Sequence, residues 1–150
     1  MKKNVRYKNE YQNKGHECKN LVIRCMDFRF TPYIKGLLDQ MYADEGGFES
    51  YDSPGVGAGA SKAIIDQGSR PVVFSSIDIA VQKHQAKRVV VIDHIDCGAY
   101  GGSSQFESPE KEEEFHIIKL KEAGEILKDK YPELEVVLLY QDWDMLTLIK

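Results

Sequence analysis

The sequence has no hydrophobic stretch that approaches the roughly 20 residues needed to cross a lipid bilayer. Its N-terminal segment is basic but lacks the apolar centre of a secretory signal, so we expect the protein in the cytoplasm. Positive charge is not in excess either, because 20 Lys and Arg residues face 24 Asp and Glu residues. The net charge of −4 gives no electrostatic reason to expect a nucleic acid or an anionic membrane as a partner.

Cysteine is scarce, with three residues in the chain. An odd count argues against a disulfide framework. In a reducing compartment, cysteines in short motifs are more often metal ligands or nucleophiles. Cys18 has no motif around it and is expected to be a semi-buried apolar side chain. The other two cysteines stand in clusters of chemically reactive residues.

A chain of 150 residues, of which 42% are hydrophobic and 29% charged, has the size and composition of one globular domain. We expect a short N-terminal arm over residues 1–19 and a single domain over residues 20–150. Apolar runs predict strands, and capping residues and helical spacing predict helices. The strands are expected at 21–23, less clearly at 48–51, at 88–93 and, as the last one, at 135–140; the helices are expected at 31–42, where Thr31 is the N-cap, from 69 to about 84, and at 109–130. This alternation predicts the α/β class, with a mostly parallel central β-sheet flanked by helices.

Two clusters follow directly on predicted strands: residues 25–29 (CMDFR) and residues 94–98 (HIDCG). The carboxyl ends of neighbouring parallel strands meet at one edge of the sheet, which is where ligands bind. Cys25, His94 and Cys97 would supply two thiolates and one imidazole, a ligand set that selects zinc over magnesium or calcium. Three protein ligands leave one position open, as in catalytic zinc sites. Gly98 is expected to let the backbone turn sharply after Cys97.

Asp27 and Arg29 are expected to act beside the metal. Two thiolates neutralise Zn²⁺, so such a site should acidify bound water less than a site with three histidines, where the pKa falls to about 7. Asp27 could accept a hydrogen bond from zinc-bound hydroxide and orient it. Arg29 could hold that carboxylate away from the metal in a bidentate pair.

The pattern Cys-x-Asp-x-Arg followed by His-x-x-Cys-Gly resembles the signature of the β-class carbonic anhydrases. The similarity covers residues 21–29 and 75–102, with a weaker likeness in the strand at 135–140. It implies an enzyme that interconverts CO₂ and bicarbonate through zinc-bound hydroxide, with Cys25, His94 and Cys97 as ligands and Asp27 and Arg29 as a dyad beside them. It also implies a homodimer or higher homo-oligomer, and a closed state in which Asp27 becomes the fourth ligand.

The sequence departs from that family at several places. The usual Arg-Asn-Ala-Gly segment is replaced by residues 52–57 (DSPGVG), and the interval from Cys25 to His94 is longer than usual. Asp93 stands where a glycine commonly precedes the histidine, and Ile95 where a small hydroxyl residue is common. These changes indicate a short, divergent member, in which the segment 53–59 bears on catalytic competence.

Other functions stay open at this point. One is a zinc protein of the same fold without CO₂ hydration, either structural, sensing or a hydrolase of CO₂-like molecules such as carbon disulfide. Another is a nucleotide-phosphate site at the glycine-rich residues 55–59. Their spacing is not that of the dinucleotide fingerprint, and Asp78, about twenty positions on, lies in a predicted helix rather than at a strand end. No residue stands out as proton shuttle; the candidates are His16, His84 and His116. Asp142 and Asp144 could pair as acid and base, but the ends of strands often carry such residues.

Overall fold

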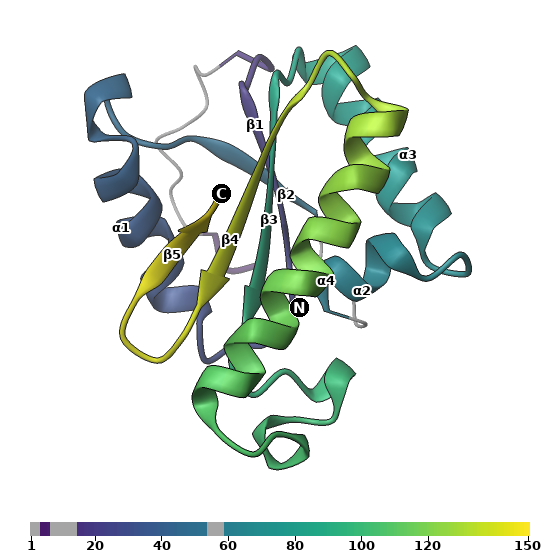
Figure 1. The fold of residues 1–150 in the computed structure, drawn as a ribbon. Coiled ribbons are helices and arrows are strands. Elements are labelled where there is room, and N and C mark those ends of the chain that lie inside the picture. Colours follow the sequence, from purple (N-terminus) through teal and green to yellow (C-terminus); the bar gives the residue numbers. More distant parts are fainter. Residues whose placement is uncertain (1–3, 7–14, 54–58) are drawn as a thin grey trace.

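A computed structural model describes residues 4–6, 15–53 and 59–150, and Figure 1 shows its fold. One five-stranded sheet runs through the molecule in the order β2-β1-β3-β4-β5. Its first four strands are parallel, and β5 runs antiparallel to β4. The strands are β1 (Asn20–Arg24), β2 (Ser50–Ser53), β3 (Arg88–His94), β4 (Glu135–Gln141) and β5 (Leu146–Ile149). The predicted fold class, α/β with a mostly parallel sheet, is confirmed.

Helices cover both faces of the sheet (Figure 1). One face carries α1 (Thr31–Met41), and the other carries α2 (Ala60–Ile65), α3 (Arg70–His84) and α4 (Pro109–Lys130). Short 3₁₀ segments connect the elements: η1 (Ala43–Glu45), η2 (Gly98–Tyr100) and η3 (Ser103–Gln105). None of the helices in the described ranges is long and apolar enough to cross a membrane.

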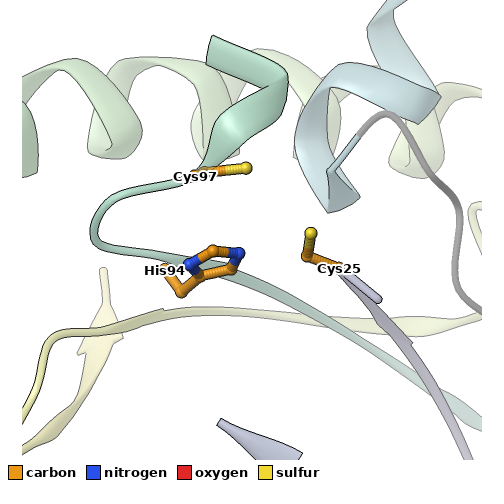
Figure 2. A group of neighbouring side chains, drawn as sticks. All are labelled: Cys25, His94 and Cys97. Atoms are coloured by element: carbon orange, nitrogen blue, oxygen red, sulfur yellow. The ribbon is translucent and has the colours of Figure 1, made fainter. Parts of the chain in front are cut away.

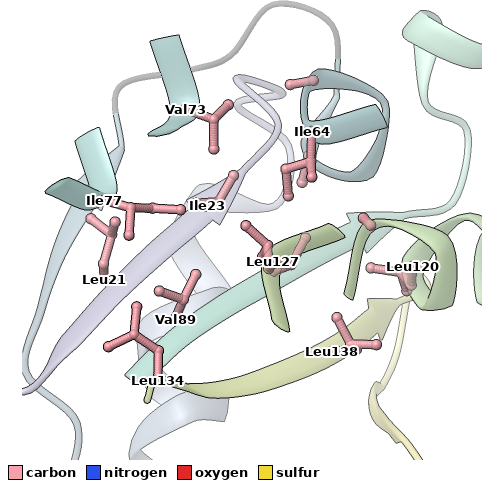
Figure 3. Close-up of a cluster of buried hydrophobic side chains, with 14 of the residues drawn as sticks. Leu21, Ile23, Ile64, Val73, Ile77, Val89, Leu120, Leu127, Leu134 and Leu138 are labelled. Carbon is pink, nitrogen blue, oxygen red and sulfur yellow. The ribbon is translucent and has the colours of Figure 1, made fainter. Parts of the chain in front are cut away.

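Side-chain alternation along the strands divides the core in two. In β3 all seven residues are buried; Val89 and Val91 face α2, α3 and α4, whereas Val90 and Ile92 face α1. The larger half, with Ile77 and Leu120 among its buried residues, is drawn in Figure 3. A strand buried on both faces is almost continuously apolar, which is why β3 is the most easily predicted strand of the sequence.

The chain order places a crevice at the carboxyl ends of β1 and β3. From β1 the chain passes through α1 to β2 on one side, and it then returns through α2 and α3 to β3 on the other side of β1. Because the two connections lie on opposite faces, the sheet has a topological switch point between β1 and β3. Open parallel sheets bind their ligands at such points.

Two local predictions were wrong, and one helix is not predicted by the sequence pattern. Thr31 is the first residue of α1 rather than its cap, and its Oγ1 accepts a hydrogen bond of 3.0 Å from Arg24 Nη1. Helix α2 has only six residues, too few to show a helical period in the sequence.

Strand β5 follows β4, which was expected to be the last strand. In the turn between them, Asp142 Oδ1 accepts hydrogen bonds from the backbone amides of Asp144 and Met145, both at 2.7 Å. Asp142 thus has a structural role in that turn.

Helix α4 offers a matched test of the core. Leu120 is fully buried, whereas Ile118 on the same helix is 64% exposed. We expect Leu120→Ala to lower the free energy of unfolding by about 2–5 kcal/mol, because it leaves a cavity in the larger half of the core. Ile118→Ala should cost less than about 1 kcal/mol. Urea unfolding followed by circular dichroism measures both, and equal losses would contradict the assigned packing.

Candidate metal centre

Cys25, His94 and Cys97 meet at the switch point. The ligand atoms of the three side chains lie within 4.8 Å of one another (Figure 2). Cys25 directly follows β1, and His94 is the last residue of β3. The strands are parallel neighbours, with Arg24 opposite Ile92, so the two ligands are close in space although they lie far apart in the sequence. The structure therefore brings together the three predicted ligands, from two strand ends and one turn.

The turn between His94 and Cys97 depends on Asp96. Asp96 has a φ of 58°, a left-handed conformation that aspartate tolerates better than most residues. Gly98 does not adopt a positive φ in η2, and a Cβ there would meet nothing within 4 Å. The expectation that Gly98 makes the turn is therefore wrong. Asp96 brings Cys97 back toward His94.

Gly59 closes the other side of the cluster. It has a φ of 77°, and a Cβ at this position would lie 3.2 Å from Cys97 Sγ and 3.3 Å from the Ala99 Cβ. Backbone conformation and close approach both require glycine here. Residues 54–58, which hold most of the glycine-rich segment, lie outside the described residues.

The His94 ring is prepared to bind a cation. Its Nδ1 lies 2.7 Å from the Ile95 carbonyl oxygen, which fixes the tautomer with a proton on Nδ1. Its Nε2 is buried and has no hydrogen-bond partner among the described residues. The ring nitrogen that Figure 2 shows facing the sulfur atoms is the one that would bind a metal ion. Burial lowers the pKa of His94, but its contacts with Cys25 and with the Ile95 carbonyl oxygen outweigh burial and raise it. A cation at Nε2 would bind the neutral ring. A buried, unpartnered nitrogen beside two sulfur atoms fits a zinc ion.

The two thiols have different proton affinities. The hydrogen bond from the Cys97 thiol, aided by His94, lowers the pKa of Cys25 to about 4 although burial opposes the shift. The same contact with Cys25, together with burial, raises the pKa of Cys97. Without a cation, therefore, one proton is held between two sulfur atoms. A divalent cation would replace that proton and accept both thiolates.

Asp27 and Arg29 form the predicted pair. Arg29 Nε donates to Oδ1 and Oδ2 of Asp27 at 2.9 and 3.0 Å, and Nη2 donates to Oδ2 at 2.5 Å. These bonds hold the pKa of Asp27 below its usual value. Arg29 Nη1 also donates to Asp96 Oδ2 at 2.9 Å, and the guanidinium lies 5.2 Å from the Trp143 ring centre. Arg29 thus ties the first cluster to the turn of the second.

A small cavity of about 10 Å³ lies beside these groups. A volume of this size holds about one water molecule. The cavity is lined by Arg24, Cys25, Asp27, Phe30, Ile34, Ile92, His94 and Gln141. Gln141 pairs with His94 in the β3–β4 register, and its buried Oε1 has no partner within the described part of the chain. No pattern in the sequence points to Gln141, which follows an apolar strand like an ordinary polar end.

The histidines considered as proton shuttles, and Asp78, lie away from the Cys25–His94–Cys97 group. His84 Nδ1 contacts the His16 carbonyl oxygen at 2.9 Å, near the start of β1, at the opposite edge of the sheet. His116 is buried and bonded to Asp93. Asp78 accepts a hydrogen bond of 2.8 Å from the Tyr131 hydroxyl. None of these residues lines the described cavity.

The architecture and the cluster define an α/β protein with a Cys-His-Cys group at a topological switch point. The family model described as "Putative carbonic anhydrase" matches residues 15–147, and the chain belongs to this family. The resemblance to β-carbonic anhydrases is thereby confirmed.

Relatives and solved structures agree with this assignment. An uncharacterised protein of Rickettsia conorii is 32% identical over 138 residues, covering 88% of this chain and 72% of its own length. The β-carbonic anhydrase CafA of Aspergillus fumigatus has a TM-score of 0.62 at 18% identity, over 91% of this chain and 77% of its own. A carbonic anhydrase from Glaciozyma antarctica has a TM-score of 0.58 at 18% identity, over 95% and 89% of the two chains. At this identity the structures establish the shared fold.

The low pKa of Cys25 predicts its reactivity. In protein stripped of metal, the thiolate should be present throughout pH 5–7, so the rate of Cys25 alkylation by iodoacetamide should be nearly constant over that range. Peptide mass spectrometry with a pH series measures this rate, and added zinc should suppress it. Cys18, whose thiol donates to the Asn20 carbonyl oxygen, is the internal control that zinc should not protect. A rate for Cys25 that rises tenfold per pH unit would contradict the prediction.

Proposed function

We propose that this protein is a zinc-dependent carbonic anhydrase that catalyses the reversible hydration of CO₂ to bicarbonate. The observation that carries the proposal is the Cys25–His94–Cys97 group, with the buried Nε2 of His94 close to both sulfur atoms, beside a carboxylate that Arg29 holds in place. Membership of the carbonic anhydrase family supports the reaction class.

Each residue has a distinct part in this proposal. Cys25, His94 and Cys97 would hold the ion. A zinc ion held there would supply hydroxide at a pH at which free water is not ionised. Asp27, kept ionised by Arg29, accepts a hydrogen bond from the hydroxide. This hydrogen bond directs a lone pair of the hydroxide oxygen toward CO₂. Hydroxide and CO₂ combine to bicarbonate, and each cycle takes up one water and releases one proton.

The cavity suits a small apolar substrate. Phe30, Ile34 and Ile92 give the cavity apolar walls. Two buried polar atoms of its lining side chains, Gln141 Oε1 and His94 Nε2, have no hydrogen-bond partner among the described residues. Because the cavity holds about one water molecule, its lining side chains must shift to admit CO₂.

Stopped-flow CO₂ hydration on protein of verified zinc content tests the proposal. Activity should increase toward alkaline pH, because a site with two thiolates acidifies water weakly. Stoichiometric zinc without hydration up to about pH 9 would instead favour the non-hydratase of this family. Absence of zinc together with retained nucleotide would favour the nucleotide-binding function.

Asp27→Asn tests whether Asp27 acts on the nucleophile or binds the zinc ion. The amide keeps the size of Asp27 but loses the charge that directs the nucleophile, so we expect turnover to fall by about 10²–10⁴-fold with zinc still bound. Metal analysis and stopped-flow rates on the same sample measure both quantities. Asp129→Asn, exposed at the end of α4, is the control and should change neither. Loss of zinc in Asp27→Asn would make Asp27 a ligand, as in the closed state.

We further propose that two copies of the chain associate next to the site. Met26, Phe28 and Tyr33 are exposed apolar residues around the Cys25–Arg29 segment, and Phe28 is 80% exposed. Adjacent exposed apolar side chains of this kind are typical of interfaces. Phe28→Glu should shift the protein to the monomer in sedimentation equilibrium. Ile79→Glu, on an exposed position of α3, should not. A monomeric unmodified protein would contradict the proposal.

A further inference from the structure

Helix α4 carries two polar side chains on its buried face, Glu112 and His116. They are 1% and 0% exposed, and they lie four residues apart, so both project from the same side of the helix. Neither lines the metal cavity. A buried acid and a buried imidazole are costly unless each has a partner, and both partners lie in the segment that bears His94 and Cys97.

His116 holds the residue that precedes His94. Its Nδ1 lies 2.9 Å from Asp93 Oδ2, and donates to it because the carboxylate only accepts. Asp93 also accepts from Ser61 at the start of α2: the amide at 2.9 Å and the hydroxyl at 2.5 Å. The end of β3 is thereby fixed to two helices at the position before the ligand.

Glu112 holds the residue that precedes Cys97. Its Oε1 accepts the backbone amide of Asp96 at 2.6 Å, and its Oε2 accepts the Ser103 hydroxyl at 2.7 Å. Asp96 is the left-handed residue of the turn. A charged acceptor on its amide stabilises the conformation that brings Cys97 back toward His94.

We propose that Glu112 and His116 are positioning residues of the metal centre, which fix the spacing and direction of His94 and Cys97 from a helix that contributes no ligand. His116 contacts Asp93, the residue before His94, and Glu112 contacts Asp96, the residue before Cys97. A shift of either contact therefore moves the ligand that follows it. The Asp93–Ser61 bonds also fix the start of α2, and with it the backbone of Gly59, which lies close to Cys97 Sγ. The inference rests on the proposed metal binding, and it explains why both polar groups are buried on one helix face.

The test compares variants that remove or retain the His116 contact. His116→Leu removes it, whereas His116→Asn can place its amide nitrogen where Nδ1 stands. We expect His116→Leu to weaken zinc binding about 10–100-fold and to alter the visible absorption of the protein saturated with Co²⁺. His116→Asn should recover most of the affinity and the unmodified spectrum. Chelator competition gives the affinity, and thermal unfolding of the metal-free proteins is measured alongside.

Glu112→Gln extends the test if His116→Leu does not fold. It keeps the size of the side chain and loses the charge that holds the Asp96 amide, so zinc affinity should fall about tenfold with a changed Co²⁺ spectrum. Glu114→Gln is the matched control, because Glu114 is exposed on the same helix and pairs with Lys111. It should change nothing.

The outcomes separate the two proposals. If the unmodified protein binds zinc, and Glu112→Gln and the His116 variants lower the unfolding temperature but leave affinity and Co²⁺ spectrum unchanged, the two residues only stabilise the packing of α4 and the inference is wrong. If the unmodified protein binds neither Zn²⁺ nor Co²⁺, the proposed function fails and the inference fails with it.

Discussion

Parallel pairing of β1 with β3 is the constraint on which the site depends. The register sets Arg24 beside Ile92. Cys25 directly follows Arg24, and His94 lies two residues after Ile92, so the two side chains come close together. A one-residue slip of either strand would turn every side chain to the other face and separate the ligands. The buried alternation of both strands prevents that slip, since Val22, Val90 and Ile92 must face α1 while Leu21, Val89 and Val91 face the other helices. The core thus specifies the arrangement of Cys25 and His94 as well as the fold.

Charge around the cluster is mostly negative. This edge of the sheet gathers the Cys25 thiolate and the side chains of Asp27, Asp93, Asp96 and Glu112. Arg29 neutralises part of that charge through Asp27 and Asp96. The Asp93 carboxylate adds to the effects that raise the pKa of Cys97, so the metal-free protein disfavours a second thiolate. A cation would relieve the repulsion between these groups, so their arrangement favours a divalent ion.

Sequence patterns are informative here where chemistry and periodicity coincide. The ligand residues stand directly after the clearest apolar runs, and parallel strands bring such positions to one edge, so residue order alone predicts the Cys-His-Cys group and the Asp27–Arg29 pair. Helix α4 could be predicted with its full bounds because Pro109 and the acidic residues after it mark its start. Gln141, Asp96 and Glu112 could not be found this way. Their importance comes from contacts between segments far apart in the chain, and nothing next to them in the sequence encodes those contacts.

The Asp93 position links the divergence of this chain to its packing. Position 93, where a glycine would add no side chain, carries a carboxylate here, and it is 2% exposed. Such a group is tolerated only with donors, and it has three, from the Ser61 amide, the Ser61 hydroxyl and His116. Ser61, on α2, and His116, on α4, therefore supply the hydrogen bonds that the buried Asp93 carboxylate requires. Because Ser61 follows Gly59 by two residues, the same carboxylate also fixes the backbone next to Gly59, where a Cβ would lie 3.2 Å from Cys97 Sγ. The carboxylate next to His94 thus joins β3 to both α2 and α4, so the position of His94 depends on the packing of two helices.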